Sequence, residues 1–334
     1  MTEKVGVALI GAGWMGGVHA AGYVKMPDVQ LVAVSDVDRA RAESFAKDYN
    51  IPHVYTDYRE MLRRDDIAAV DVTTPPFNHL EIVRDVLRAG KHGSVQKPIT
   101  LTMEEANAMV AEAEGSKKIL MASYMYRFAP LTKKVKELIE EGNLGEPRMG
   151  YHRMMIPTWR PGPWTWDSSL SGGMIVEMLT HGFDLYNWYI GKPVRVHAAG
   201  NCTRRPGFVD MACVTVTYEN GAVVSVQATW AAPDNFPTSK IELIGSKGAI
   251  YFEGGTFASA SPMYRLTFVD GETAHSWENP GRGQTEKLRA YVDAIKSGDA
   301  SGLPTVRDGR AALEVALAAR KSIEEGCIVD LPLA

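Results

Sequence analysis

The sequence predicts an α/β protein of two domains: a doubly wound parallel sheet comes first, and an α+β domain with a large, mainly antiparallel open sheet follows. Three observations lead to this prediction. An apolar, β-branched run at residues 5–10 ends abruptly in glycine and is followed by a helical pattern. Strand-like and helix-like segments then alternate up to about residue 122. Beyond residue 190, strand-like segments follow one another with short turns, as in an antiparallel sheet.

The first strand ends in the spacing G-x-G-x-x-G, formed by Gly11, Gly13 and Gly16. In such a motif the first glycine permits a sharp turn, the second lets a pyrophosphate approach the main chain, and the third lets the helix pack close to the strand. The N–H groups and the positive dipole end of the helix, at Trp14 and Met15, then suit phosphate binding. Because glycines also mark ordinary βα turns, a unit without a ligand is the alternative.

A second apolar strand, over residues 29–34, leads to Asp36. This residue lies about 20 positions beyond the last glycine, where a carboxylate accepts hydrogen bonds from the ribose on the adenine side of a dinucleotide. A 2′-phosphate would meet this negative charge, so Asp36 favours NAD over NADP. Arg39 is close in sequence and leaves some room for NADP.

The other elements of the first domain follow from composition, capping residues and apolar runs. Helices are expected over residues 38–49, 58–64, 79–89 and 103–114. Strands are expected over residues 68–74 and 119–122, and a separate strand between them ends at residue 98. Asp57 and Asn78 are the expected N-caps of the second and third of these helices. Right-handed crossovers place the C-terminal ends of all strands at one edge of the sheet, where ligands bind. The polar residues at such ends are Asp36, Thr73, Thr74, Gln96 and Lys97.

The pattern changes near residue 123, and we expect domains at residues 1–122 and 123–334. Helices are expected over residues 131–141 and 175–190, and strands over 194–199, 211–218, 222–229, 240–244, 249–252 and 264–269. Two final helices, near residues 286–296 and 309–325, could pack back on the first domain.

Composition excludes several classes of protein. A net charge of −4 gives no reason to expect binding to nucleic acid or to an anionic membrane surface. No apolar run is long enough to span a bilayer, and no signal-peptide pattern precedes the first strand. Cys202, Cys213 and Cys327 are widely spaced, which argues against a zinc or disulfide framework and for a reducing compartment. We therefore expect a cytoplasmic protein.

Five motifs, in order along the chain, carry a resemblance to a known family. They are Gly11–Ala20, Thr74–His79, Gln96–Pro98, Tyr126–Pro130 and Gly172–Asp184. Over its full length the chain resembles the Gfo/Idh/MocA family of NAD(P)-dependent sugar and polyol oxidoreductases, and within it the inositol dehydrogenases. Two positions depart from the family pattern, since Gln96 stands where Glu is usual and Glu177 where Asp is usual.

The resemblance implies hydride transfer to a nicotinamide. The protein must then bind and orient the coenzyme and substrate, and move one proton. Lys97 and His181 are the expected catalytic residues. We expect His181 to act as the base while Lys97 orients and polarises the reacting oxygen, and the reverse assignment stays open. Glu177 and Asp184 lie four and three residues from His181, so one helix face would carry all three. The alternatives are a surface lysine, a core histidine paired with acids, and a metal site, which no other ligand cluster supports.

The resemblance also implies residues that bind the cofactor and the substrate. The cofactor contacts are Gly11, Gly13, Trp14, Met15, Gly16, Asp36, Thr73, Thr74, Pro75, Asn78, His79, Gln96 and Lys97. The substrate contacts are Lys97, Tyr124, Arg127, Arg153, Trp159, Trp164, Glu177, His181 and Asp184. Three of the seven tryptophans fall within residues 159–166, and tryptophan faces stack on sugar rings. Subunit contacts or loop packing are the alternative for them, and His79 could simply begin its helix.

Together these observations predict an NAD-dependent dehydrogenase that oxidises a ring secondary alcohol of a sugar, anhydrosugar or cyclitol. We expect a homodimer or homotetramer formed through the C-terminal sheet, without a metal. Two alternatives stay open: a reductase of a keto-sugar or aldose that uses NAD(P)H, and a non-catalytic regulator that binds a dinucleotide.

Overall fold

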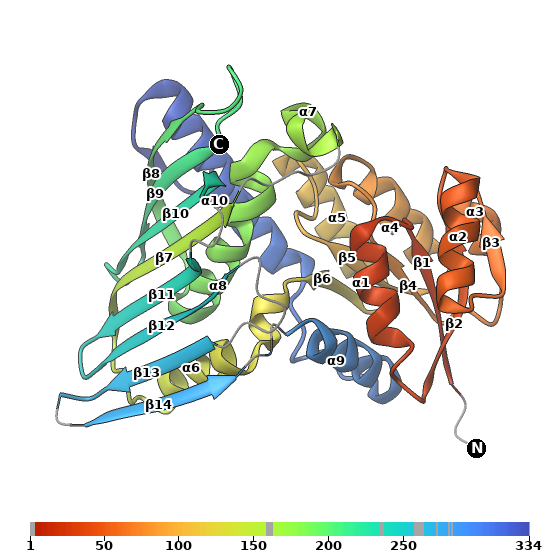
Figure 1. Ribbon diagram of the computed structural model, residues 1–334, viewed down its shortest axis with the longest axis horizontal. Coiled ribbons are helices and arrows are strands. Elements are labelled where there is room, and N and C mark those ends of the chain that lie inside the picture. Colours follow the sequence, from red (N-terminus) through yellow and green to blue (C-terminus); the bar gives the residue numbers. More distant parts are fainter. Residues whose placement is uncertain are drawn as a thin grey trace. The chain divides into compact units, whose positions relative to one another are not determined.

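The structure, a computed structural model, describes residues 4–157, 163–233, 237–256, 264–271, 273–279, 281 and 283–333. The chain forms two compact units (Figure 1). The first comprises Met1–Met125 and Gly283–Arg310, and the second comprises Tyr126–Arg282 and Ala311–Ala334. Among the residues that the structure describes, no helix has the length and apolar character that a membrane crossing requires.

The first unit is built on six parallel strands in the order β3-β2-β1-β4-β5-β6. The strands are β1 (Val5–Ile10), β2 (Val29–Ser35), β3 (His53–Tyr55), β4 (Ala69–Val72), β5 (His92–Gln96) and β6 (Leu120–Ser123). In register, Val7 of β1 lies between Leu31 of β2 and Ala69 of β4. The strand order reverses at β1, which is the Rossmann arrangement and confirms the predicted fold class of this domain.

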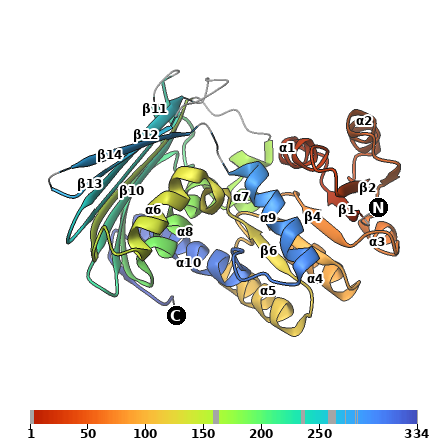
Figure 2. The same ribbon diagram turned by 90° about the horizontal axis from the view of Figure 1, so that it is seen from below.

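Helices cover both faces of this sheet. They are α1 (Trp14–Tyr23), α2 (Arg39–Tyr49), α3 (Tyr58–Met61), α4 (His79–Arg88), α5 (Met103–Gly115) and α9 (Gln284–Ser297). Figure 2 shows α1 and α9 on one face and α4 and α5 on the other. In α4 the buried residues are Ile82, Val83, Val86 and Leu87, a helical spacing that turns one apolar stripe to the sheet.

Side chains cap several of these helices. Asp57 accepts a hydrogen bond from the backbone N–H of Arg59, which confirms the predicted cap of α3. The predicted cap of α4 is wrong. The side-chain oxygen of Asn78 accepts a hydrogen bond from the Thr74 hydroxyl at 2.7 Å, and it makes no cap bond to the helix. Residues Pro76–Asn78 form a 3-10 turn instead, so the chain enters α4 without a polar cap from Asn78.

The second unit is built on nine strands in the order β14-β13-β12-β11-β7-β10-β9-β8-β15. The strands are β7 (Pro147–Pro157), β8 (Pro193–Asn201), β9 (Met211–Tyr218), β10 (Val223–Ala232), β11 (Pro237–Gly245), β12 (Ala249–Thr256), β13 (Tyr264–Val269), β14 (Ala274–Asn279) and β15 (Val329–Asp330). Among the described strands of this sheet, only β7 and β10 pair in parallel, so the sheet is mainly antiparallel, as predicted.

Helices pack on one face of this sheet. Figure 2 shows α6 (Pro130–Glu140) and α8 (Thr180–Ile190) on that face. The Tyr186 hydroxyl of α8 lies 2.8 Å from the carbonyl oxygen of Tyr151 in β7 and 2.9 Å from that of Glu242 in β11. This buried tyrosine therefore fastens α8 to the centre of the sheet. Two further helices are α7 (Ser168–Ser171) and α10 (Val306–Glu325), the latter with residues in both units.

The helix predicted over residues 175–190 begins differently from the prediction. Its first turn, Ile175–Leu179, is a π-helical turn, and α8 follows from Thr180. Two glycines with positive φ, Gly172 and Gly173, precede it. The Thr180 hydroxyl donates a hydrogen bond to the carbonyl oxygen of Val176 at 2.9 Å, a side-chain bond that competes with the regular helical ladder. Turns of this kind are frequent at functional sites.

His152 of β7 is fully buried below α8. Its ring centroid lies 6.3 Å from that of Tyr126 and 6.1 Å from that of Tyr186. Gly182 leaves room for it, because a Cβ there would lie 3.1 Å from His152 Nδ1. Neither ring nitrogen has a hydrogen-bond partner among the described residues. Burial lowers the pKa of His152 to about 3, so the folded protein holds this ring neutral.

His152 should make the protein sensitive to acid. The unfolded chain takes up a proton near pH 6.5 and the folded chain only near pH 3, so the free energy of unfolding falls as the pH drops through this window. The slope from this residue is about 1.4 kcal/mol per pH unit. We expect His152→Leu to remove about one proton from the pH dependence of urea unfolding, measured between pH 4.5 and 7. The exposed His197 supplies the control, His197→Leu, which should keep the wild-type slope. An unchanged slope in His152→Leu would contradict the expectation.

Candidate coenzyme and catalytic site

The turn between β1 and α1 has a backbone that requires glycine at two positions. Gly11 has a φ of 103°, a conformation that side chains rarely adopt. A Cβ at Gly16 would collide with the carbonyl oxygen of Gly11. Gly13 is different, because a Cβ there would meet no atom within 4 Å. Its surroundings are open, so a phosphate can approach the main chain there.

The first turn of α1 is available to an anion. Gly13 stands at the N-cap and provides no side-chain bond, so the first N–H groups of the helix lack a side-chain acceptor from the cap. Trp14, the first residue of the helix, is 71% exposed. Uncapped N–H groups and the positive end of the helix dipole favour a phosphate at this place.

Asp36 lies directly after β2 and is held against the glycine turn. Its Oδ2 accepts a hydrogen bond from Ala12 N at 2.9 Å, and its Oδ1 accepts one from Asp38 N at 2.9 Å. Arg41 Nη1 lies 3.3 Å from Oδ1. Arg39 turns to Glu43 instead, at 2.8 Å. A fixed, buried carboxylate beside a glycine turn and an open helix end fits the adenosine ribose and pyrophosphate of a dinucleotide.

The strand β4 leads into residues that brace the same turn. The Thr73 hydroxyl donates to the carbonyl oxygen of Gly11 at 2.8 Å, so β4 and the glycine turn are held together. Thr74 is the donor to Asn78 described above, and Pro75 begins the short turn that follows. These residues all follow the C-terminal end of β4, at the sheet edge where β1 also ends.

His79 is the first residue of α4 and is fully buried. Its Nε2 lies 2.8 Å from the carbonyl oxygen of Thr74, and its Nδ1 lies 3.1 Å from the carbonyl oxygen of Pro98. Burial lowers the pKa of His79 despite these carbonyl contacts. The ring therefore lies between the turn after β4 and the segment after Lys97, and in its neutral form it donates its single N–H to one of these carbonyl oxygens, a role beyond simply beginning the helix.

Lys97 follows the last residue of β5, at the same edge as the glycine turn and Thr73. Its side chain is half-buried. The preceding residue, Gln96, is 7% exposed, and its amide nitrogen lies 2.9 Å from His19 Nε2 and 3.0 Å from Ser123 Oγ. Gln96 is thus held by buried side chains of the first unit.

The helix predicted to carry the base lies in the second unit. Glu177 belongs to the π-helical turn, and His181 is the second residue of α8. Both side chains are half-buried. The His181 ring centroid lies 5.0 Å from that of Tyr126. The structure thus places an imidazole one turn after a carboxylate, a combination suited to moving a proton.

Asp184 and Arg127, both predicted to contact substrate, bind each other. Arg127 Nε donates to Asp184 Oδ2 at 2.9 Å, and Arg127 Nη2 to Oδ1 at 2.6 Å. Asp184 is 1% exposed. The Arg127 guanidinium also lies over the Trp188 ring, 5.6 Å from its centroid. This two-bond pair is a strong contact between the start of the second unit and α8.

The other predicted substrate residues are distributed over both units. Tyr124 belongs to the first unit and is 1% exposed, whereas Arg153 of β7 and Trp164 are half-buried. Trp159 lies outside the described residues. The nearby Trp166 packs edge-on against Trp230 at 5.6 Å, which is the loop-packing role weighed for this group.

Sequence reasoning missed a set of buried polar residues around Gln96. His19, Asp71 and Lys287 are fully buried in the first unit. Two of them had a signal: Asp71 interrupts an apolar strand, and Lys287 stands next to Leu288 on the face of α9 that is buried. A charged residue on the apolar face of a predicted helix or strand would be buried, and a buried charge is stable only with a partner of opposite charge.

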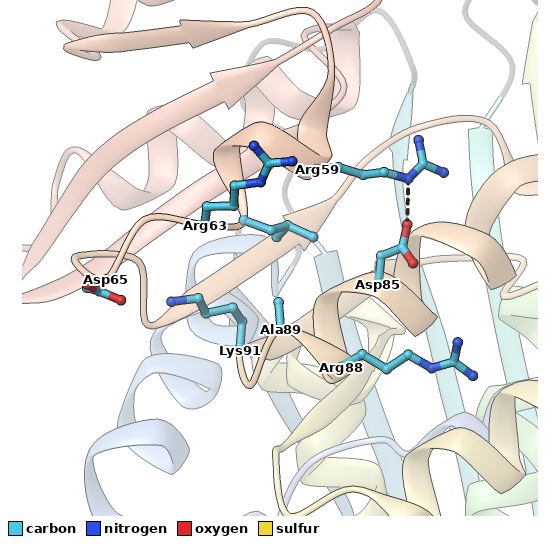
Figure 3. A pocket seen from close by; sticks show the side chains of 8 residues that line it. Arg59, Arg63, Asp65, Asp85, Arg88, Ala89 and Lys91 are labelled. Carbon is cyan, nitrogen blue, oxygen red and sulfur yellow. Dashed lines mark ion pairs between the residues drawn. The ribbon is translucent and has the colours of Figure 1, made fainter.

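A cavity of about 460 Å³ elsewhere on the first unit is no candidate for the coenzyme (Figure 3). Asp65 precedes β4 and Lys91 precedes β5, so the cavity lies at the N-terminal edge of the strands, away from the glycine turn. Two of its cations have partners: Arg59 Nε lies 3.0 Å from Asp85, and Lys91 Nζ donates to the Arg64 carbonyl oxygen at 2.7 Å. Across the described ranges, no group of three or more potential metal ligands occurs.

The open surroundings of Gly13 permit a clean test of the coenzyme site. We expect Gly13→Val to fold with the wild-type melting temperature, since no atom lies within 4 Å of the added Cβ. The new side chain would occupy the space of the pyrophosphate, so affinity for NAD should fall at least about a hundredfold. Calorimetric titration and thermal melting measure the two quantities. Gly115→Val is the matched control, because Gly115 is equally open and follows no strand end. Unchanged NAD binding in Gly13→Val would refute the site.

Comparison with known proteins yields similar chains of the same length. The chain is 28% identical to a myo-inositol 2-dehydrogenase of Thermotoga maritima over 97% of this chain and 98% of the relative. It is 29% identical to an inositol 2-dehydrogenase of Rhizobium meliloti over 97% of this chain and 98% of the relative. The solved structure of a levoglucosan dehydrogenase in complex with NADH has the same fold, with a TM-score of 0.88 and 23% identity over 99% of this chain and 100% of that one.

Family models match both parts of the chain. Residues 5–124 match the oxidoreductase family with an NAD-binding Rossmann fold. Residues 132–251 match the Gfo/Idh/MocA C-terminal domain. The expected enzyme class and coenzyme are thereby confirmed. The chain belongs to the Gfo/Idh/MocA family of oxidoreductases, and its first part is the NAD-binding Rossmann domain of that family.

Proposed function

We propose that the protein is an NAD-dependent dehydrogenase that oxidises a ring secondary alcohol of a sugar, anhydrosugar or cyclitol. The observation that carries the proposal is the edge of the first sheet, where the glycine turn, the fixed Asp36 carboxylate and Lys97 all follow strand ends. The names of the relatives, two inositol 2-dehydrogenases and a levoglucosan dehydrogenase, support the class of substrate. The first unit would bind the coenzyme, and the second would bind substrate and form the oligomer.

The residues that would hold NAD come from the first unit. The N–H groups of Trp14 and Met15 would bind the pyrophosphate, and Asp36 would accept the ribose hydroxyls of the adenosine. Thr74 and Asn78 would line the path to the nicotinamide half. The bound nicotinamide would accept the hydride that leaves the substrate carbon.

The chain's own task in the reaction is to move the hydroxyl proton. His181, half-buried beside Tyr126, would accept this proton, because a neutral imidazole is a base that works near neutral pH. Lys97 would donate a hydrogen bond to the same oxygen and stabilise the negative charge that develops there. Glu177, one turn before His181, would orient the imidazole. Tyr124, Arg153 and the tryptophans Trp159 and Trp164 would bind the remaining hydroxyls and the ring.

The paired Arg127 and Asp184 have a more indirect part in this proposal. Both atoms of the Asp184 carboxylate accept hydrogen bonds from Arg127, so a substrate hydroxyl would have to share this acceptor. We propose that the pair fixes the start of the second unit against α8. A substrate hydroxyl would then bind at one edge of the pair. The three cysteines are free, which suits a reducing compartment, and we propose a cytoplasmic location.

Replacing the two proposed catalytic residues should separate chemistry from coenzyme binding. We expect Lys97→Met and His181→Gln each to lower kcat about 10²–10⁴-fold, the usual contribution of a positioned acid or base. The dissociation constant for NAD should change less than about threefold. NAD reduction, screened over cyclitols, aldoses, anhydrosugars and glycosides, measures kcat. The exposed Lys117 supplies the control variant Lys117→Met. Tight NAD binding without turnover on the whole panel by the wild type would favour a non-catalytic regulator.

The sheet of the second unit has an apolar area on the face opposite α8. Met149 of β7 and Val223 of β10 are direct neighbours in register and are 58% and 41% exposed. Tyr251 of β12, also exposed, and Val269 of β13 extend this area across the sheet. Apolar side chains gathered on one face of an open sheet favour contact with a second copy of the chain.

We expect light scattering to give the mass of a homodimer or homotetramer. The variant Met149→Lys/Val223→Lys puts two neighbouring charges into this apolar area. It should shift the mass toward the monomer by desolvation and like-charge repulsion. Val37→Lys, at a site that is 91% exposed in the first unit, is the control. A monomeric wild type at high protein concentration would overturn the proposed assembly.

A further inference from the structure

A cluster of polar side chains lies buried in the core of the first unit. Its members are His19 and Tyr23 of α1, Asp71 of β4, Gln96 of β5, Ser123 of β6 and Lys287 of α9. We call this set the buried cluster. His19, Asp71 and Lys287 have no exposed surface. The set joins the helix that follows the glycine turn, three adjacent strands and α9, far apart along the chain.

The contacts of Lys287 show which groups carry protons. Its Nζ lies 2.9 Å from His19 Nε2, 2.5 Å from Ser123 Oγ and 2.9 Å from Gln284 Oε1. An ammonium group has three N–H donors and no acceptor, so each donor has one acceptor here. His19 Nε2 must then accept, and its ring proton is on Nδ1.

The proton on His19 Nδ1 has a partner as well. Nδ1 lies 2.6 Å from Asp71 Oδ2, and the Tyr23 hydroxyl donates to the same oxygen at 3.1 Å. Asp71 is therefore an acceptor for two donors, as an ionised carboxylate can be. The chain of hydrogen bonds runs from the ammonium through the imidazole to the carboxylate.

The charges of the buried cluster balance. Burial lowers the pKa of His19, so its ring is neutral. Burial raises the pKa of Asp71, but His19, Lys287 and Tyr23 outweigh it, and the pKa is lowered overall. Burial lowers the pKa of Lys287 to about 8, which leaves it mainly protonated at neutral pH. Tyr23 and Tyr291, the other titratable groups that face Asp71, have raised pKa values, mainly from burial, and are neutral. One buried anion thus faces one buried cation.

Gln96 shares two acceptors with Lys287. Its amide nitrogen lies 2.9 Å from His19 Nε2 and 3.0 Å from Ser123 Oγ. The Ser123 hydroxyl oxygen has two lone pairs and can accept from both donors, whereas His19 Nε2 has a single lone pair, which the two donors share. The last residue of β5 is therefore fastened to the atoms that Lys287 holds. The next residue along the chain is Lys97, which the cluster itself does not include.

We propose that Lys287 is a positioning residue for the reaction: its buried ammonium fixes His19 and Ser123, the two acceptors of Gln96, and so sets the place of Lys97 at the end of β5. This rests on the proposed catalytic role of Lys97. Without the ammonium, Asp71 is an uncompensated buried charge, and two acceptors of the cluster lose a donor. The end of β5 can then shift, and small displacements of a catalytic group lower the rate strongly.

Charge balance and positioning can be separated with a double variant. Lys287→Met leaves Asp71 unbalanced, and we expect a melting temperature lower by about 5 °C or more and a kcat lower at least about tenfold. Asp71→Asn/Lys287→Met is neutral again, so its melting temperature should return most of the way to wild type. Its kcat should stay at least about tenfold low, with the NAD dissociation constant within about threefold of wild type. Recovery of kcat together with the melting temperature would overturn the proposal.

A second variant detaches β5 while keeping both charges. Gln96→Met leaves Lys287 and Asp71 paired through His19, so it should melt close to the wild type but show the reduced kcat of the double variant. If the Lys287 variants do not fold, this variant still tests the path from the cluster to Lys97, and its NAD dissociation constant, expected within about threefold of wild type, separates that path from the coenzyme contact expected of Gln96. A wild-type kcat in Gln96→Met would contradict the proposed path from the cluster to Lys97.

Coupling to Lys97 distinguishes this inference from the function it rests on. If Lys287 acts through Lys97, adding Lys97→Met to the double variant should give a kcat no lower than that of Lys97→Met alone. Multiplying losses would refute the inference. A Lys97→Met variant with wild-type kcat would instead refute the proposed role of Lys97, whatever the Lys287 variants do.

Discussion

Close packing around the glycine turn is the constraint on which the first unit depends. The turn is held by β4, through the hydroxyl of Thr73 on the Gly11 carbonyl oxygen, and by β2, through the Asp36 carboxylate on Ala12 N. Gly16 brings α1 so near that a Cβ would collide with Gly11. The same contacts that close the fold therefore leave the N–H groups of α1 open and place a carboxylate beside them, which is the geometry that a dinucleotide needs.

The protein buries histidines in two physically different ways. In the first unit His19 and His79 have a polar partner near each ring nitrogen, so their rings act as connectors between segments. In the second unit His152 has no hydrogen-bond partner within the part of the chain that the structure describes, and its environment is aromatic. The rings of His19 and His79 thus gain hydrogen bonds that fix strand ends. Burial of His152 instead leaves two desolvated ring nitrogens, and this is the origin of the expected acid sensitivity.

The sequence predicted the fold where its signals are local. The Rossmann domain follows from the glycine spacing and from alternation of strands and helices, both visible within about 30 residues. The central strand β7 was not predicted, because Ile156 is the single β-branched residue in its run of Met, Tyr, His and Arg. Its parallel pairing with β10 depends on the whole unit and has no local signal. The π-helical turn is accompanied by a side-chain bond from Thr180 to Val176, and apolar periodicity reveals neither feature.

The residues of the candidate site likewise fall into those with a local sequence signal and those that meet only through long-range contacts. Lys97 and Asp36 follow apolar strands and could be recognised from the residues around them, whereas Lys287 meets His19 across 268 positions of sequence. That contact also gives a physical reason for the amide at position 96, where the family pattern has a carboxylate. Asp71 already supplies one buried negative charge, and Lys287 is the cation that balances it. A second carboxylate at the same acceptors would leave the buried cluster with a net negative charge away from water, whereas the Gln96 amide donates to both acceptors and keeps the balance.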